Sequence, residues 1–182
     1  MSQMKRALEK SGFGKPTEIV GETHQKSTKK DRDRQALLKK MTFIKKEEAE
    51  RLVDEYLKGK IQYYLDEEKK ETNEKFFDEY PRALAYVLVE KDNKLSQLRK
   101  FYYVIERISR SINLGMDVKQ FKGELKALVG HAWNKYDSNY VSKEFHDMLE
   151  KNVEAIKDSK DFQMFKQHFE AILCYVPKMK ED

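Results

Sequence analysis

The sequence predicts an all-α protein, a compact bundle of about six helices with a basic, partly disordered N-terminal extension. Three observations support this fold class. After residue 46, apolar residues recur every three or four positions, which is the spacing of helices with one buried face. No segment of comparable length alternates apolar and polar residues as a half-buried strand does. Only seven glycines and three prolines occur among 182 residues, so turn-forming residues are too few for many hairpins.

Changes in composition divide the chain into three parts. We expect residues 1–45 to be a basic extension, mobile or partly helical, because 1–30 has no sustained apolar spacing and a short helix can start near Asp31 or Asp33. Residues 46–177 are expected to be the helical domain, and residues 178–182 a polar tail. A domain of this length can bury one substantial hydrophobic core.

The apolar spacing locates the helices of the domain. The first is expected over 47–65, where Gly59 weakens the helix by about 1 kcal/mol relative to alanine without ending it. A polar break follows at 66–75, and Pro81 suits the first turn of the next helix. The remaining helices are expected at about 95–112, 117–135 and 141–157, and from the capping sequence DSKD (158–161) up to Pro177.

The formal net charge of +5 is unevenly distributed. Residues 1–46 contain 13 Lys and Arg against 5 Asp and Glu, whereas the other 136 residues contain 24 against 27. A basic segment can neutralise phosphates and steer association without reading sequence. A solubilising tail has the same composition, and composition alone does not separate the two.

The sequence favours a cytoplasmic protein with no membrane partner. It has no run of about 18 apolar residues that could span a membrane. Its first residues lack the apolar core of a signal peptide. The single cysteine, Cys174, allows no internal disulfide and is interpreted as a small hydrophobe in an apolar helix.

No motif for catalysis, metal binding or cofactor binding is present, so we expect none of the three. The four histidines form no HExxH pair, the lone cysteine forms no CxxC pair, and glycine-rich phosphate loops are absent. His131 and His168 are interpreted as partly exposed helix residues and Trp133 as a core or interface residue. An enzyme is possible only if its site is assembled from residues that the sequence does not connect.

The stretch LSQLRKFYYVIERI (95–108) places cations on the outer face of a helix. At about 100° per residue, the apolar residues between Leu98 and Ile112 form a stripe that covers roughly 160° of the helix circumference. Arg99, Tyr103 and Arg110 lie within about 40° of one another on the opposite face. Lys100 and Arg107 lie beside them. Such cations can hold phosphate oxygens, and the tyrosine can stack on a base.

The next helix repeats this pattern. Lys119, Lys122 and Lys126 form a line beside its apolar face, and Lys135 lies near its end. The other interpretation of both helices is a solvated charged surface, on which Glu106 pairs with Arg110 four residues later. Spacing alone leaves these two interpretations open.

Three short motifs resemble a known family. SQLRKFY (96–102) resembles the SQIRKFY-type hallmark of the small helical subunit of type III-A CRISPR effector complexes. LKALVGHAWNK (125–135) resembles that family's LKPKLAYAAGR segment, and DFQMFKQHFEAILCY (161–175) is similar to its last helix. The threonines that commonly precede SQ are replaced by Lys94 and Leu95, so Asn93 or Ser96 would have to serve as the N-cap.

The resemblance implies a non-catalytic subunit of a ribonucleoprotein complex in antiviral defence. Its expected partners are guide RNA, target RNA, further copies of itself stacked head to tail, and the backbone and large subunits. By position in the motifs, the implied RNA contacts are Arg99, Lys100, Lys126 and Lys135. Arg107, Arg110, Lys119 and Lys122 are candidates from helical geometry only, and Gln97 is a hallmark residue that either caps its helix or touches RNA. The alternative function is a structural helical adaptor without RNA contact.

Overall fold

The computed structural model describes residues 28–177, and within this range it contains seven α-helices, one 3-10 helix and no strand. The helices are α1 (Lys29–Lys40), α2 (Lys46–Lys58), η1 (Glu74–Phe76), α3 (Glu79–Glu90), α4 (Leu95–Asn113), α5 (Val118–Asp137), α6 (Lys143–Ala155) and α7 (Ser159–Tyr175). The predicted all-α class is confirmed. The number of helices exceeds six because α1 is regular at the end of the expected extension. The predictions for residues 1–27 and 178–182 lie outside the described residues.

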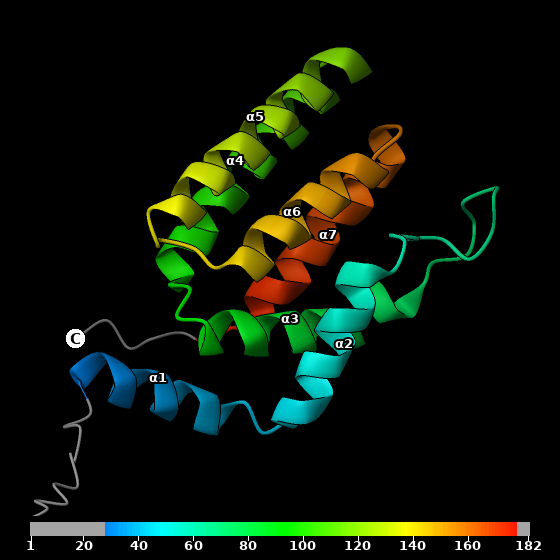
Figure 1. Cartoon of the computed structure of the whole chain (residues 1–182). Coiled ribbons are helices and arrows are strands. Elements are labelled where there is room, and N and C mark those ends of the chain that lie inside the picture. The colour runs from blue at the N-terminus through cyan, green and yellow to red at the C-terminus, as the bar shows by residue number, and fades with distance from the viewer. Residues whose placement is uncertain (1–27, 178–182) are drawn as a thin grey trace, which may run out of the picture.

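Helices α4 to α7 form an antiparallel four-helix arrangement, and α3 crosses one end of it (Figure 1). Helix α4 packs against α5 and α7, and α5 packs against α6. Helix α3 contacts α7 and also carries α1 and α2. Short connections join the four helices, as expected for neighbouring antiparallel helices. None of the helices in residues 28–177 combines the length and apolar character needed to cross a bilayer.

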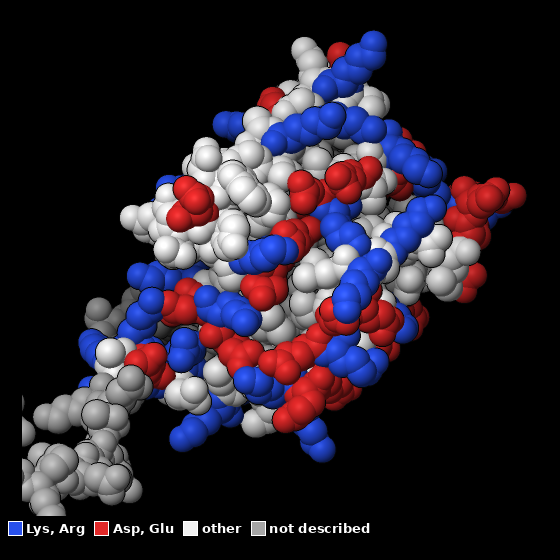
Figure 2. All heavy atoms as spheres, in the orientation of Figure 1, with Lys and Arg blue, Asp and Glu red and all other residues white. Residues whose placement is uncertain are grey.

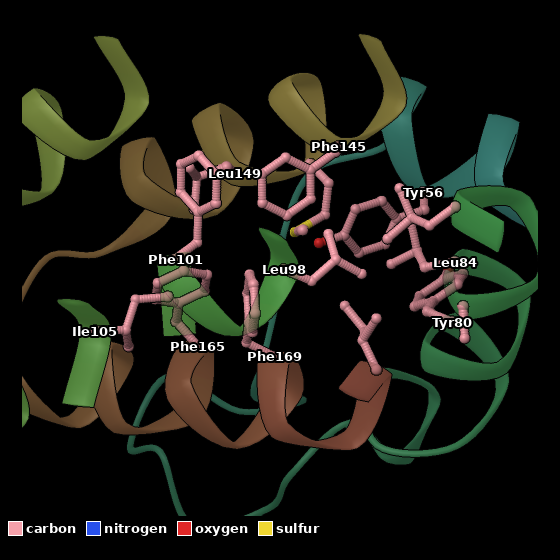
Figure 3. Packing of buried hydrophobic residues seen from close by; sticks show 14 of the residues in the cluster. Tyr56, Tyr80, Leu84, Leu98, Phe101, Ile105, Phe145, Leu149, Phe165 and Phe169 are labelled. Carbon is pink, nitrogen blue, oxygen red and sulfur yellow. The ribbon is translucent and has the colours of Figure 1, made fainter. Parts of the chain in front are cut away.

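The core lies where the apolar spacing places it. Phe145 and Phe165 are fully buried, and the rings of Phe101 and Phe145 meet edge to face with centroids 4.9 Å apart (Figure 3). Aromatic pairs in this arrangement stabilise a core beyond their burial alone. The apolar stripe of α4 is confirmed at Leu98, Phe101, Ile105 and Ile108, all at most 3% exposed. The opposite face of α4 is therefore left to solvent.

The helix predicted over 47–65 is wrong beyond residue 58. Helix α2 ends at Lys58, and the N–H of Gly59 donates to the Glu55 carbonyl at 2.8 Å. A Cβ on Gly59 would lie 2.8 Å from that same oxygen, so only glycine fits this close approach. Lys151 of α6 donates to the carbonyls of Leu57 and Gly59 and so satisfies the end of the helix.

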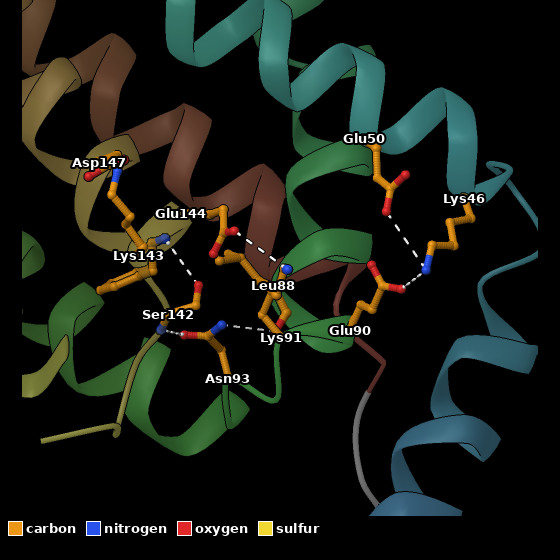
Figure 4. A network of polar contacts seen from close by, with 11 residues as sticks. Lys46, Glu50, Leu88, Glu90, Lys91, Asn93, Ser142, Lys143, Glu144 and Asp147 are labelled. Atoms are coloured by element: carbon orange, nitrogen blue, oxygen red, sulfur yellow. Dashed lines mark hydrogen bonds and ion pairs between the residues drawn. The ribbon is translucent and has the colours of Figure 1, made fainter. Parts of the chain in front are cut away.

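Asn93 connects the start of α4 to the start of α6. Its side chain is buried, its Oδ1 accepts from the N–H of Ser142 at 2.8 Å, and its Nδ2 donates to the Leu88 carbonyl at 3.0 Å (Figure 4). The expectation that Asn93 or Ser96 caps α4 is wrong. The N-cap residue is Lys94, and no side chain caps this helix. Asn93 instead fixes the place from which Lys94 and Arg99 project.

The predicted partial exposure of His168 is also wrong. His168 is fully buried, and its Nδ1 lies 2.5 Å from the Phe76 carbonyl oxygen. Because a carbonyl only accepts, Nδ1 donates there and Nε2 accepts from the Tyr56 hydroxyl at 3.1 Å. Asn152 donates to the same hydroxyl, and the Tyr63 hydroxyl donates to Asn152. The histidine is part of a hydrogen-bonded core network.

Three further burial predictions have different outcomes. The one for Cys174 is wrong, because this residue is exposed and not a core hydrophobe. Trp133 is 53% exposed, which excludes the core and leaves the interface as its prediction, and its ring meets those of Tyr136 and His146. His131 is exposed, as expected. Each failed residue lies on an amphipathic helix, where spacing predicts the buried arc better than its edges.

Candidate nucleic-acid interface

The cations of α4 project from the face opposite its core stripe. Arg99 is half-buried, whereas Lys100, Arg107 and Arg110 are exposed. Tyr103, on the same face, is 61% exposed. The arrangement expected from helical spacing is therefore present. The buried residues fix how α4 is rotated about its axis, and so fix the direction in which the cations project. Guanidinium and ammonium groups on such a face can donate charge-assisted hydrogen bonds to phosphate oxygens.

Most of these cations have no acidic partner. Within residues 28–177, Arg107 is the one member of the eight candidates that forms an ion pair, with its Nη2 3.2 Å from Glu124 Oε2 of α5. The expected pair of Glu106 with Arg110 is absent from the described contacts. Glu106 instead accepts a hydrogen bond of 3.5 Å from the Tyr102 hydroxyl. Arg110 is consequently available to an external anion.

The Tyr102 hydroxyl joins Glu106 to helix α7. This hydroxyl lies at the contact between α4 and α7 and donates to Glu170 of α7 as well as to Glu106. Burial, followed by the hydrogen bond to Glu170, raises the pKa of Tyr102 above its ordinary value. The neutral hydroxyl therefore keeps its single proton, which points mainly to Glu170, with Glu106 in a weaker contact at 3.5 Å.

The cations of α5 fall into two separate places. Helix α5 runs antiparallel to α4, with Arg107 beside Glu124 and the Phe101 ring 5.5 Å from the His131 ring. In this register Lys119 and Lys122 lie near the Arg110 end of α4, whereas Lys135 lies near its start. Lys119 and Lys135 are about 24 Å apart along the helix at 1.5 Å per residue. The structure thus brings together subsets of the eight candidates rather than one cluster.

Lys122 and Lys126 face a surface of mixed charge. They line a groove of about 490 Å³ between α5 and α6, together with Glu150 and Glu154. No ion pair joins these lysines to the glutamates among the described contacts. The carboxylates still lower the positive potential there, because charges at such distances interact through the groove. This groove favours a phosphate less than the open face of α4 does.

Lys135 already interacts with an aromatic ring. Its side chain is half-buried, and its Nζ lies 5.0 Å from the centroid of the Tyr140 ring, over the exposed loop after α5. A cation over a ring keeps its charge and its donors. Tyr140 is 55% exposed, so its ring is also open to solvent.

The α4–α5 hairpin carries the positive charge of the domain. Residues 94–137 contain nine Lys and Arg against four Asp and Glu, a net charge of +5, although residues 47–182 together are acidic by three charges. Figure 2 shows basic side chains gathered over the end of α5 farthest from α1, and basic and acidic side chains mixed across the middle of the same face. The hairpin is a local positive surface on an otherwise acidic domain.

One group of possible metal ligands occurs in residues 28–177, at His146, Asp147 and Glu150 of α6. The Asp147 carboxylate is already occupied, since it lies 2.5 Å from Lys143 Nζ and 3.1 Å from His146 Nδ1. Burial favours a higher pKa for Asp147, but these hydrogen bonds outweigh it and the pKa is lowered. Both Asp147 oxygens are therefore engaged by Lys143 and His146.

Lys94 is a candidate that sequence reasoning missed. It stands at the N-cap of α4, where a capping side chain is usual, and the apolar spacing of the helix gives no sign of a cation there. Its side chain is exposed and shares a groove with Arg99. Gln97, the hallmark residue, is half-buried and does not cap α4.

Residues 70–181 match the family model described as Csm2 Type III-A. No curated protein and no solved structure matches the chain. The matched segment includes α3 to α7, and therefore all eight candidate residues, whereas α1 and α2 precede it.

Proposed function

Because the matched segment covers more than half of the chain's 182 residues, the chain belongs to the Csm2 type III-A family, and from this membership we propose that it binds RNA and is not catalytic. The protein is a small subunit of a type III-A CRISPR effector complex. In this proposal it acts in the cytoplasm in antiviral defence, and it holds the backbone of guide and target RNA without reading their sequence. RNA and DNA cleavage belong to other subunits.

The observation that carries the proposal is the unpaired charge on α4. Arg99, Lys100 and Arg110 share the solvent face of a rigid helix, and none has an acidic partner within the described part of the chain. Phosphate contacts fix position but carry no sequence information. In an RNA-guided complex base pairing supplies the sequence recognition, so backbone contacts are sufficient for this subunit.

Stacking of copies is the second part of the proposal. Leu114 and Val118, at one end of the α4–α5 hairpin, are 89% and 41% exposed. Trp133 and Tyr140 are more than half exposed toward the other end of α5. Apolar side chains at both ends of one element suit a heterologous, head-to-tail contact between copies. Repetition along the complex lets weak RNA sites act together.

One observation favours the adaptor function for part of the surface. Lys122 and Lys126 share their groove with Glu150 and Glu154, so this region can contact a partner protein of mixed charge as well as RNA. The two functions differ in what a charge reversal does. Reversal on α4 weakens RNA retention if the subunit binds RNA, and leaves it unchanged if the subunit is only an adaptor.

The test uses the reconstituted effector complex carrying Arg99→Glu with Lys100→Glu. The expected result is complete assembly with target RNA retained about tenfold less tightly, because two phosphate contacts are replaced by repulsion. The matched control is Lys157→Glu with Lys160→Glu, which reverses two exposed cations that also lack acidic partners in residues 28–177, near the start of α7. Equal RNA retention by both variants and the unmodified complex would refute RNA contact by α4. RNA cleavage by the isolated subunit would refute the non-catalytic role.

A further inference from the structure

A groove of about 860 Å³ lies between α1 and the start of α4. Its charged lining is Lys29, Lys30, Asp33 and Arg34 of α1, with Lys94 and Arg99 at the start of α4. Asp92, in the turn before α4, completes the set. Helix α1 lies outside the segment matched to the family, so the match assigns no role to this side of the groove.

The charge of the groove is positive after internal pairs are considered. Lys30 forms an ion pair with Asp92, and Arg34 Nη2 lies 3.4 Å from Asp31 Oδ1. Lys29, Lys94 and Arg99 have no ion pair or side-chain hydrogen bond with any residue of 28–177. Three unpaired cations therefore border one concave surface together with one carboxylate, Asp33, which leaves a net charge of +2 where their fields add.

The groove also contains hydrogen-bond donors that have no acceptor in the described residues, one on a side chain and others on the backbone. The Nε of Arg34 is shielded from solvent and has no hydrogen-bond partner in the described part of the chain. Helix α4 begins in the groove with no capping side chain, and while the N–H of Gln97 donates to the Lys94 carbonyl, those of Leu95 and Ser96 have no partner in residues 28–177. Leu37, Val89 and Leu95 form an apolar floor that strengthens electrostatic attraction above it. An anionic oxygen at the start of α4 would satisfy the open N–H groups there, whereas the shielded Nε of Arg34 is reached only if its side chain moves.

The chain's own N-terminal segment does not suit this groove. Residues 1–27 contain five Lys and Arg against three Asp and Glu, so the segment has the same sign as the surface. A nucleic-acid backbone has the opposite sign and a regular spacing of charges. Arg99 also lies in the groove, which makes the groove continuous with the proposed RNA face of α4.

We propose that α1 and the start of α4 form a second RNA backbone site, in which Lys29, Lys94 and Arg99 hold phosphate oxygens and α1 extends the RNA surface beyond the family segment. This inference rests on the proposed RNA-binding function. It assigns to α1 a role in affinity rather than in folding of the core, consistent with its having no buried residue.

The test is binding of a short labelled RNA of mixed sequence by the full chain carrying Lys29→Glu with Lys94→Glu. Both residues stand at helix N-termini, where glutamate favours the helix, so loss of folding does not explain a loss of binding. We expect about tenfold weaker binding, and a salt dependence whose slope falls by about 1.4 for two lost phosphate contacts.

The control, Arg32→Glu with Lys39→Glu, makes the same change of charge with both substitutions on α1. Both residues are exposed and lie on the side of α1 away from the groove. Its affinity should remain within about twofold of the unmodified chain. Equal losses in the two variants would overturn the inference, because the effect would then follow net charge and not the groove.

A third variant separates this inference from the proposed function. Lys100→Glu with Arg110→Glu changes the face of α4 without touching the groove. If it weakens binding while the groove variant does not, the groove inference is wrong and the RNA face stands. If neither weakens binding, both are wrong.

The other candidate occupant is an acidic surface of a second copy. Sedimentation of the same variants tests it. If Lys29→Glu with Lys94→Glu lowers self-association and leaves RNA affinity unchanged, the groove is a protein interface and the inference fails.

Conversely, Asp92→Asn frees Lys30 and is expected to tighten RNA binding about threefold. Unchanged or weaker binding would count against the groove.

Discussion

Protonation of His168 should make the protein sensitive to mild acid. The side chain is fully buried, and burial lowers its pKa from 6.5 to about 4, although the Phe76 carbonyl partly opposes this shift. The folded state therefore binds the proton less well than the unfolded chain. Stability is fully present above pH 6.5 and is lost as the pH falls toward the folded-state pKa.

The magnitude follows from the two pKa values. Linkage gives a loss of about 2 kcal/mol between pH 7 and pH 5, and about 3 kcal/mol at most below pH 4. Urea unfolding of the full chain, followed by circular dichroism at pH 7 and pH 5, measures it. Because carboxylates also titrate in this range, the quantity of interest is the difference between the unmodified chain and His168→Gln.

His168→Gln should lose about 2 kcal/mol less than the unmodified chain between these pH values. The matched control is His131→Gln, which changes an exposed histidine of α5 and should keep the full pH dependence. If His168→Gln and the unmodified chain show the same pH dependence, then the buried, neutral assignment of His168 is wrong.

Three other substitutions test the local structure, each by urea unfolding. Asn93→Ala removes both hydrogen bonds of a buried amide and leaves the N–H of Ser142 unpaired, so it should cost about 2–3 kcal/mol; a loss below about 0.5 kcal/mol would contradict the role given to Asn93. Gly59→Ala places a Cβ 2.8 Å from the Glu55 carbonyl and should cost about 1–2 kcal/mol. Gly123→Ala meets nothing within 4 Å inside α5 and should stabilise the protein by up to about 1 kcal/mol. Equal effects at the two glycines would show that α2 does not end as described.

The order and approximate bounds of the helices could be predicted because burial repeats with the helical period. Phe145 and Met148 lie on the buried face of α6 as their spacing requires. Several helix starts were also readable, since Asp158 accepts the first N–H groups of α7 and Pro81 lies in the first turn of α3. The end of α4 is likewise followed by a glycine, Gly115, whose φ of 98° is one that other residues rarely adopt.

The end of α2 could not be predicted from local spacing. Apolar residues continue past Gly59, yet the helix ends at Lys58, and Lys151, more than 90 residues later, binds the carbonyls of Leu57 and Gly59 at this end. The burial of His168 likewise depends on Phe76 and on Tyr56, which come from distant segments. Contacts between segments far apart in sequence leave no mark in the periodicity of either one.

Helical spacing predicted which cations share a face of α4. It could not predict which acidic residues and helices lie beside them in the folded protein. Spacing placed Arg99 and Arg110 together on α4, and the structure bears this out. The contact that Glu106 makes instead of pairing with Arg110 is with the Tyr102 hydroxyl, which also donates to Glu170 of α7, and spacing along α4 does not indicate it. The position of α1 beside Arg99 follows from its packing on α3, and the sequence of neither helix indicates it.

The central claim is that the cations of α4 bind RNA phosphates without reading sequence. The most direct measurement is the affinity of the full chain for two RNAs of unrelated sequence over a range of salt concentrations, with and without Arg99→Glu and Lys100→Glu. The account predicts equal affinities and equal salt slopes for the two RNAs, and a slope smaller by about 1.4 in the variant. No binding at low salt, or a slope that the variant leaves unchanged, would contradict it.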